Sequence, residues 1–454
     1  MDKRLIVCFV ALVVLLAVLG GVTVTSFRSM RTAFDSGLLV EKQEEVKCAV
    51  EVAYAVIAEQ YAQEMAGKIS REEAQERAKK TIRSMRYGGE GYLWINDFDR
   101  VMIMDPIKPE LEGKDLTEFK DTAGRRIFLD FVDEARKGSG FVAYLWPKPG
   151  QSEPAKKVSY VKGFAPWGWL LGTGLYVDDV ETAVGHTWVN ALRNGKLIPV
   201  VALAMLLLAG SLIVLVKKGK NLTPVEKTLG FCLTGILPFL VLLGGITLVS
   251  AGSMKTAFHD ALMHCRQDRV SNLVQIASAV VDEQYALEVA GKISRAEAQE
   301  CVKKTIRNMR YGNGGKEYFW MNRFDGIEVM HPVRPDLEGT SVLGIEDPNG
   351  KKLYVEIIRE AREHGSGFVD YMWPKPGAKS AGSDHRADAV PKVSFVKGFP
   401  AWGWVLGTGL YVDDVDAAAG QQWLAAVQAS RLTAMVVLGL TLLVGGVVLF
   451  APIF

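Results

Sequence analysis

Four stretches of the chain are almost purely apolar, and the rest of the sequence is arranged around them. They cover residues 5–24, 197–216, 229–249 and 432–450. Each has roughly the 20 residues that a helix needs to cross the hydrocarbon core of a bilayer. None carries a charged residue in its interior, which is typical of membrane-spanning helices. We therefore expect transmembrane helices at 5–26, 197–216, 229–250 and 431–450.

Basic residues next to these stretches predict an orientation. Lys3 and Arg4 precede the first stretch, and lysines fill the short link at 217–228. Short basic segments stay on the cytoplasmic side of a membrane. We therefore expect a cytoplasmic link at 217–228 and large extracytoplasmic domains at 27–193 and 251–430.

The two large segments are copies of one another. Residues 164–179 return almost unchanged at 399–414. The similarity extends into the apolar stretches, so the repeated unit is an apolar stretch, a domain and a second apolar stretch. The first copy is called module one (residues 5–216) and the second module two (residues 229–450).

Within module one the pattern changes from helical to strand-like near Tyr87. Before it, apolar residues recur at helical spacing, and Ser70 followed by Glu73 is a capping box that begins a second helix. After it come five runs rich in aromatic and β-branched residues, at 92–96, 101–104, 141–146, 158–164 and 169–176. A helix is expected over 124–137. These elements predict an α+β fold with one five-stranded antiparallel sheet per module behind a long N-terminal helix.

A series of ordered motifs resembles the single Cache domain. In module one they are Arg86–Gly88, Tyr92–Asp97, Met104–Pro106, Gly113–Asp115, Gly138–Phe141, Tyr144–Lys148, Lys157–Lys162, Trp167–Trp169 and Gly172–Asp179, and module two repeats the series from Arg310 to Asp414. The resemblance implies a PAS-like sheet behind a long helix. It also implies the role of extracytoplasmic sensor in bacterial chemoreceptors and histidine kinases, whose ligands are commonly small organic acids.

Aromatic and charged residues on the predicted strands are candidates for a ligand pocket. Alternate residues of a strand share a face, so pairs such as Tyr144 and Trp146 point the same way. The candidates are Trp94, Asp105, Tyr144, Trp146 and Lys157 in module one, and Trp320, His331, Tyr371, Trp373 and Lys392 in module two. The alternatives are ordinary core packing for the aromatic residues and a solvated sheet edge for the lysines.

The modules differ directly after the second strand, where Asp105 in module one corresponds to His331 in module two. A histidine can donate a hydrogen bond to a carboxylate and can carry a charge near neutral pH. An aspartate repels an acid unless it is protonated or paired. We therefore favour module two as the binder of an organic acid, whereas module one binds an amine or amide, or nothing.

Several functions are not expected. The net charge of only +2 gives no general attraction to nucleic acid. The sequence has no nucleophile elbow, phosphate loop or helical pair of metal ligands, so we expect no catalysis, metal or cofactor.

The leading hypothesis is a membrane-bound sensor of small solutes for signal transduction or chemotaxis. We expect it to be a homodimer. The chain ends four residues after the last apolar stretch, so it is expected either to be a truncated receptor or to signal through a cytoplasmic or membrane partner. The alternative is a non-sensing interaction or modulatory subunit of another receptor, and an extracytoplasmic enzyme comes third.

Overall fold

The computed structural model describes residues 3–180, 182, 224–312, 314–378, 386–425 and 428. Module one contains α1 (Lys3–Met65), α2 (Arg71–Ser84), β1 (Arg86–Tyr87), β2 (Gly91–Tyr92), β3 (Trp94–Asp97), β4 (Met102–Met104), η1 (Pro109–Leu111), α3 (Ile127–Arg136), β5 (Ser139–Pro147), β6 (Pro154–Phe164), η2 (Ala165–Trp167) and β7 (Trp169–Tyr176). Module two repeats this order with α6 (Pro224–Val289), α7 (Arg295–Asn308), β8 (Arg310–Tyr311), β9 (Glu317–Tyr318), β10 (Trp320–Arg323), β11 (Glu328–Met330), η4 (Pro335–Leu337), α8 (Leu353–Glu363), β12 (Ser366–Pro374), β13 (Ala389–Phe399) and β14 (Trp404–Tyr411).

The prediction of four transmembrane helices is wrong. The apolar stretches at 5–26 and 229–250 form parts of α1 and α6, which continue as single helices of 63 and 66 residues. Nowhere in the described ranges does a helix combine the length and the apolarity that a membrane crossing requires. The other two predicted spans, 197–216 and 431–450, lie outside the described residues.

The five-stranded antiparallel sheet predicted for each module is confirmed. The strand order is β4-β3-β7-β6-β5 in module one and β11-β10-β14-β13-β12 in module two, and every pairing is antiparallel. The second helix also begins where expected, since the Ser70 hydroxyl accepts a hydrogen bond from the Glu73 backbone N–H. The short ribbon of β1 and β2 was not predicted, because two-residue strands leave no periodic signal.

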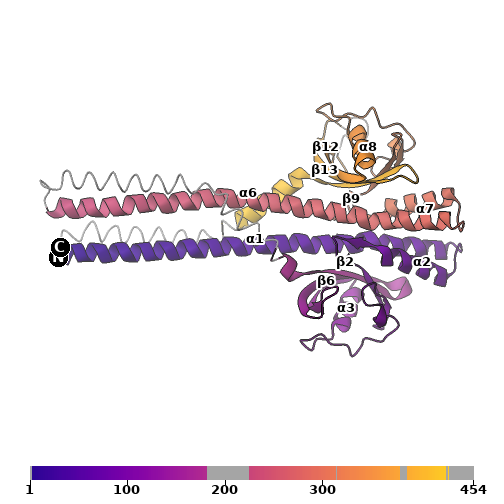
Figure 1. Cartoon of the computed structure of the whole chain (residues 1–454), viewed down its shortest axis with the longest axis horizontal. Coiled ribbons are helices and arrows are strands. Elements are labelled where there is room, and N and C mark those ends of the chain that lie inside the picture. The colour runs from indigo at the N-terminus through magenta and orange to yellow at the C-terminus, as the bar shows by residue number, and fades with distance from the viewer. Residues whose placement is uncertain are drawn as a thin grey trace. The chain divides into compact units, whose positions relative to one another are not determined.

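Each sheet is buried on both faces, and the alternation along β3 shows how. Ile95 and Leu171 pack in the same apolar core as Val50 of α1. Their neighbours Trp94 and Leu170 pack with the residues of α3 instead. The helix α3 lies beside β6 in Figure 1, as α8 lies beside β12 and β13. The long helix and the short helix therefore cover opposite faces of one sheet.

Close approach of the short helix to the sheet requires a glycine. The Gly163 amide donates to the Gly138 carbonyl at 3.0 Å, and a Cβ on Gly163 would lie 2.4 Å from the carbonyl oxygen of Ala135 at the end of α3. Gly398 stands in the same relation to Ala361 of module two, at 2.7 Å. A side chain at either position must push the helix away from the sheet.

We expect Gly163→Ala to destabilise the protein by about 1–3 kcal/mol, the usual cost of overpacking against backbone. Thermal unfolding followed by circular dichroism would measure the change. Gly344→Ala is the matched control, since a Cβ there would meet no atom within 4 Å. An equal effect of the two substitutions would contradict the close approach.

Candidate ligand-binding site

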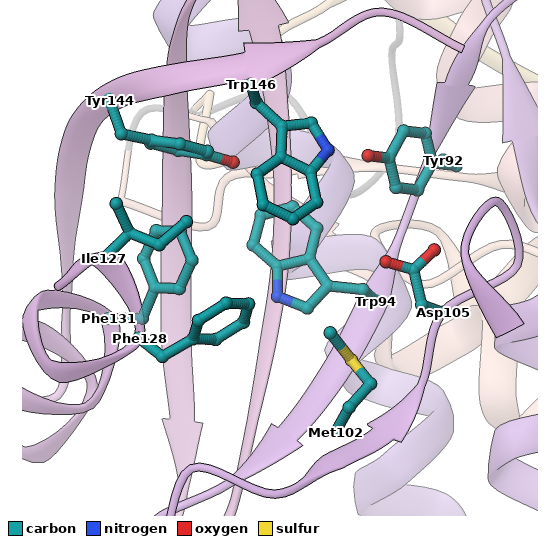
Figure 2. A pocket seen from close by; sticks show the side chains of 9 residues that line it. All are labelled: Tyr92, Trp94, Met102, Asp105, Ile127, Phe128, Phe131, Tyr144 and Trp146. Atoms are coloured by element: carbon teal, nitrogen blue, oxygen red, sulfur yellow. The ribbon is translucent and has the colours of Figure 1, made fainter. Parts of the chain in front are cut away.

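Module one contains a small pocket between the sheet and α3. It is lined by Tyr92, Trp94, Met102, Asp105, Ile127, Phe128, Phe131, Tyr144 and Trp146. Figure 2 shows the Tyr92 hydroxyl and the Asp105 carboxylate on one side of the pocket and the α3 side chains on the other. The empty space is about 240 Å³ including open solvent at the mouth, so the enclosed part of the pocket is small in this closed form.

Trp94 offers the pocket a hydrogen-bond donor. Its ring packs over Gly172, where a Cβ would lie 2.5 Å from the indole. The buried Nε1 of Trp94 has no hydrogen-bond partner in the described part of the chain, whereas the Tyr144 hydroxyl is bonded to Ser159 Oγ at 2.9 Å. A buried N–H without an acceptor costs free energy, so an acceptor supplied by a ligand would be favourable there.

Lys157 is a buried cation rather than a solvated edge residue, with a side chain only 1% exposed. Its Nζ donates to the Tyr92 hydroxyl at 3.0 Å and lies 4.5–5.6 Å from the ring centroids of Tyr92, Trp94 and Tyr176. Burial lowers the pKa of Lys157 from 10.5 to about 7, against the attraction of the Asp105 carboxylate. Small changes in its surroundings therefore decide whether this amine is charged at neutral pH.

The Asp105 carboxylate makes some of its hydrogen bonds within its own turn. The side chain is 3% exposed, and Oδ1 accepts hydrogen bonds from the backbone N–H groups of Ile107 and Lys108. These bonds hold one oxygen at the turn. The expected repulsion of an acid ligand is thus weakened by the turn and by Lys157.

His331 occupies the position in module two that Asp105 occupies in module one. Its Nδ1 accepts the backbone N–H of Arg334 at 2.9 Å, which leaves the ring hydrogen on Nε2. Burial, with the positive charges of Lys392 and Arg334, lowers the pKa of His331 to about 3. The histidine is therefore a neutral donor at physiological pH, the first of the two roles that the sequence left open.

Lys392 is enclosed by aromatic rings in the same way as Lys157. Its Nζ donates to the Tyr318 hydroxyl at 3.2 Å and lies 4.6–5.1 Å from the ring centroids of Tyr318, Trp320 and Tyr411. The buried Nε1 of Trp320 again has no hydrogen-bond partner among the described residues. Both modules thus hold an amine and an indole N–H in one aromatic enclosure.

The two aromatic enclosures differ at the end formed by β4 or β11. Met102 and Phe128 of module one correspond to Glu328 and Tyr354 of module two. Glu328 is 1% exposed and lies beside Tyr354, and no hydrogen bond of normal geometry reaches either of its carboxyl oxygens from the described residues. Burial and the Glu338 carboxylate raise the pKa of Glu328 well above its usual value, which favours the neutral form. Burial raises the pKa of Tyr371 and Glu328 adds to this shift, so Glu328 lies near the aromatic residues of the enclosure.

The structure brings most of the sequence-predicted site residues together. Trp94, Asp105, Tyr144 and Trp146 line the pocket, and Lys157 adjoins it. In module two the ring of His331 lies 6.0 Å from that of Trp373, which is 6.4 Å from that of Tyr371. Their role in binding a ligand stays a prediction.

Sequence reasoning placed Tyr92 on the same face as Trp94, but it missed other residues that close the site. These are Met102, Ile127, Phe128, Phe131 and Tyr176, with Tyr318, Glu328, Tyr354 and Tyr411 in module two. The apolar face of the 124–137 helix was recognised but treated as core. A glutamate within the strand-like run at 328–330 was the available signal for module two. Within the described ranges, no group of three or more His, Cys, Asp or Glu side chains is arranged to hold a metal ion.

Comparisons with known proteins agree with this geometry. Over 217 residues the chain is 38% identical to the methyl-accepting chemotaxis protein McpP of Pseudomonas putida, covering 46% of this chain and 38% of that protein. It is 27% identical over 180 residues to the sensor histidine kinase MctS of Rhizobium johnstonii, covering 38% of each. The chain thus spans well under half the length of these relatives.

A solved Cache chemosensory domain described for carboxylic acid recognition is 46% identical, with a TM-score of 0.30, and covers 31% of this chain and 96% of that one. The profile of the family Single Cache domain 2 matches residues 38–189 and again 262–423. The chain therefore belongs to the Single Cache domain 2 family and carries two of its sensor domains.

Proposed function

We propose that both modules bind small carboxylates and that the chain senses them. The observation that carries this proposal is the buried amine in each aromatic enclosure, Lys157 or Lys392, which lies over the ring of an indole whose N–H has no acceptor among the described residues. A buried cation needs a compensating anion, and a carboxylate can accept a charge-assisted hydrogen bond from the amine. In module two the neutral His331 adds a third donor.

The arrangement of the sheet offers a route from ligand to helix. Trp94 faces the pocket, whereas the next residue, Ile95, packs in the core with α1. A ligand that moves Trp94 therefore acts on the strand that supports the long helix. Signalling in chemotaxis or through a kinase, as in the relatives, belongs to this proposal, and the extracytoplasmic location stays a prediction.

Titration of the purified full chain with propanoate tests the proposal. We expect binding of propanoate and at least about tenfold weaker binding of propanamide, which has the same size but no charge to pair with the amine. Lys157→Met should silence module one, Lys392→Met module two, and the double variant both. Isothermal titration calorimetry gives the affinities. Equal affinity for acid and amide, or full binding by the double variant, would contradict the lysines as anion-binding groups, and binding of neither compound would favour the non-sensing subunit.

Module one should bind its carboxylate less tightly as the pH rises. Its free amine has a pKa of about 7, and a bound carboxylate favours the charged form, so binding above that pH requires uptake of a proton. In the Lys392→Met background we expect weaker affinity at about pH 8 than at about pH 6, with proton uptake visible as a dependence of the heat on the buffer.

Lys157→Arg in the same background provides the control, because a guanidinium stays protonated throughout this range. The pH dependence should disappear in that variant. An affinity of the unsubstituted pocket that does not change with pH would refute the assignment of the amine as the anion-binding group.

We also propose that the modules select different tails on the carboxylate. Met102 and Phe128 suit a hydrocarbon tail, whereas the protonated Glu328 and the Tyr354 phenol suit a tail that carries a hydroxyl group. In the Lys157→Met background we expect 3-hydroxypropanoate to bind more tightly than propanoate. Glu328→Met with Tyr354→Phe should reverse that order by about tenfold, the value of one or two neutral hydrogen bonds in a buried site.

The same double substitution should raise the melting temperature of the unliganded protein, because it removes a buried carboxyl without partners. A loss of binding can then be separated from misfolding. An unchanged ratio of the two affinities would contradict the tail selection, while leaving the carboxylate proposal standing.

A further inference from the structure

The helices α1 and α6 share one apolar core within the larger of the two compact units of the chain, Leu39–Glu181 with Leu262–Asp416. This core includes Val50 and Ala53 of α1 together with Val274 and Ala277 of α6. Val50 and Val274, like Ala53 and Ala277, occupy equivalent positions of the repeat, 224 residues apart. The same apolar seam would therefore fit two identical modules, and it does not by itself select a partner.

Salt bridges at one end of the interface follow a two-fold relation. Lys80 Nζ lies 2.9 Å from Glu283 Oε1, and Lys304 Nζ lies 3.0 Å from Glu59 Oε1. The lysines are equivalent in the two modules, and so are the glutamates. Each module thus presents the same patch to the other, as in a symmetric dimer.

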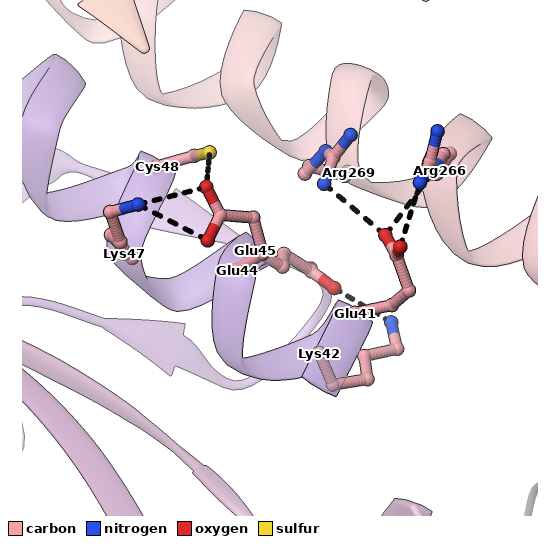
Figure 3. Close-up of polar contacts among 8 residues, drawn as sticks. All are labelled: Glu41, Lys42, Glu44, Glu45, Lys47, Cys48, Arg266 and Arg269. Atoms are coloured by element: carbon pink, nitrogen blue, oxygen red, sulfur yellow. Dashed lines mark hydrogen bonds and ion pairs between the residues drawn. The ribbon is translucent and has the colours of Figure 1, made fainter. Parts of the chain in front are cut away.

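The centre of the interface breaks this symmetry. Glu41 of α1 pairs with Arg266 at 2.8 Å and with Arg269 at 3.5 Å, and these side chains are only 10–15% exposed. Figure 3 shows both arginines of α6 reaching the one carboxylate. The amide of Asn272 donates to Glu45 at 2.6 Å, and both residues are buried.

The equivalent positions carry different chemistry in the two modules. Arg269 corresponds to Glu45, and Glu41 corresponds to Cys265. Arg266 corresponds to Lys42, so two copies of module one would set Glu41 against Lys42 and also against Glu45 of the other copy, which adds a buried pair of like charges to one attractive contact. Two copies of module two would set Arg266 and Arg269 against Cys265, which leaves both arginines without the Glu41 carboxylate. Both arrangements are costly, and only the mixed pair gives Glu41 two arginines and no opposing carboxylate.

We propose that this interface is specific for the other module of the repeat, so that modules one and two of one chain pair with each other and not with their own kind. The apolar seam and the outer salt bridges stabilise every pairing of modules. Selection between the mixed pair and a pair of identical modules comes from the central cluster, which consists of Glu41, Glu45, Arg266, Arg269 and Asn272. A single chain thereby contains the complete two-module interface, without a second chain.

Cross-linking of introduced cysteines in the full chain with a short bis-maleimide distinguishes the pairings, because the linker can span the gap that the Lys80 and Glu283 side chains fill. Lys80→Cys with Glu283→Cys, in a chain whose five native cysteines are replaced by alanine, reports the mixed pair. Lys80→Cys with Glu59→Cys reports two copies of module one, because those positions meet across chains only in that pairing. We expect the first variant to form an internal cross-link in monomeric chains and the second to form at least about tenfold fewer linked dimers. Equal yields of linked product from the two variants would overturn the proposal.

Charge reversal tests the central cluster itself. Glu41→Arg should reduce the internal cross-link between positions 80 and 283 at least about tenfold, because it sets three cations together. Adding Arg266→Glu and Arg269→Glu should restore it, which separates a pairing defect from misfolding. Glu118→Arg makes the same charge change at a site that pairs with Arg126 and should have no effect. Undiminished cross-linking in the single variant, or no recovery in the triple variant, would refute the role of the cluster.

Discussion

Burial of each sheet on both faces is the constraint on which the rest of this structure depends. A strand places successive side chains on opposite faces, so neighbouring residues of β3 lie in two different environments. Ile95 joins the core with the long helix, and Trp94 faces the short helix and the pocket. Because both faces are covered, a polar group on the pocket side is cut off from water. Lys157 and Lys392 owe their unusual surroundings to this enclosure.

Much of the fold could be predicted from the sequence because its signals are local. Five strand-like runs, the Ser70 cap and the repeat sufficed for the sheet, the second helix and the duplication. The membrane prediction failed because it considered each apolar stretch separately, whereas α1 and α6 continue well beyond those stretches as single helices. The pocket could be predicted only in part. Strand alternation identified Trp94 and Tyr144, but nothing local shows that Phe128 of a helix closes the same space.

The protonation states depended on contacts that a sequence does not contain. Free histidine titrates near neutrality, so the sequence left the charge of His331 open. In the structure, burial next to Lys392 and Arg334 keeps it neutral. Burial acts in the same sense on Glu328, whose pKa it raises well above the usual value. The neutral His331 is a hydrogen-bond donor, which is the property that a carboxylate ligand requires.

Divergence of the two modules occurred in matched changes. In the pocket, Met102 and Phe128 of module one occupy the positions that Glu328 and Tyr354 occupy in module two. The members of each pair face one another. At the helix interface, Glu45 of one copy is opposed by Asn272 of the other, where the repeat-equivalent residue is Cys48. Paired changes of this kind preserve packing while they alter selectivity, which explains how one architecture accommodates two different pockets and an asymmetric contact.

The central claim is that each buried lysine is the anchor of a carboxylate. A crystal structure of the full chain grown with propanoate tests it most directly. The claim predicts a carboxylate oxygen within hydrogen-bond distance of Lys392 Nζ and of Trp320 Nε1, with the hydrocarbon end towards Glu328 and Tyr354. Propanoate bound with its hydrocarbon end at the lysine, or bound elsewhere while the pocket stays closed, would contradict it.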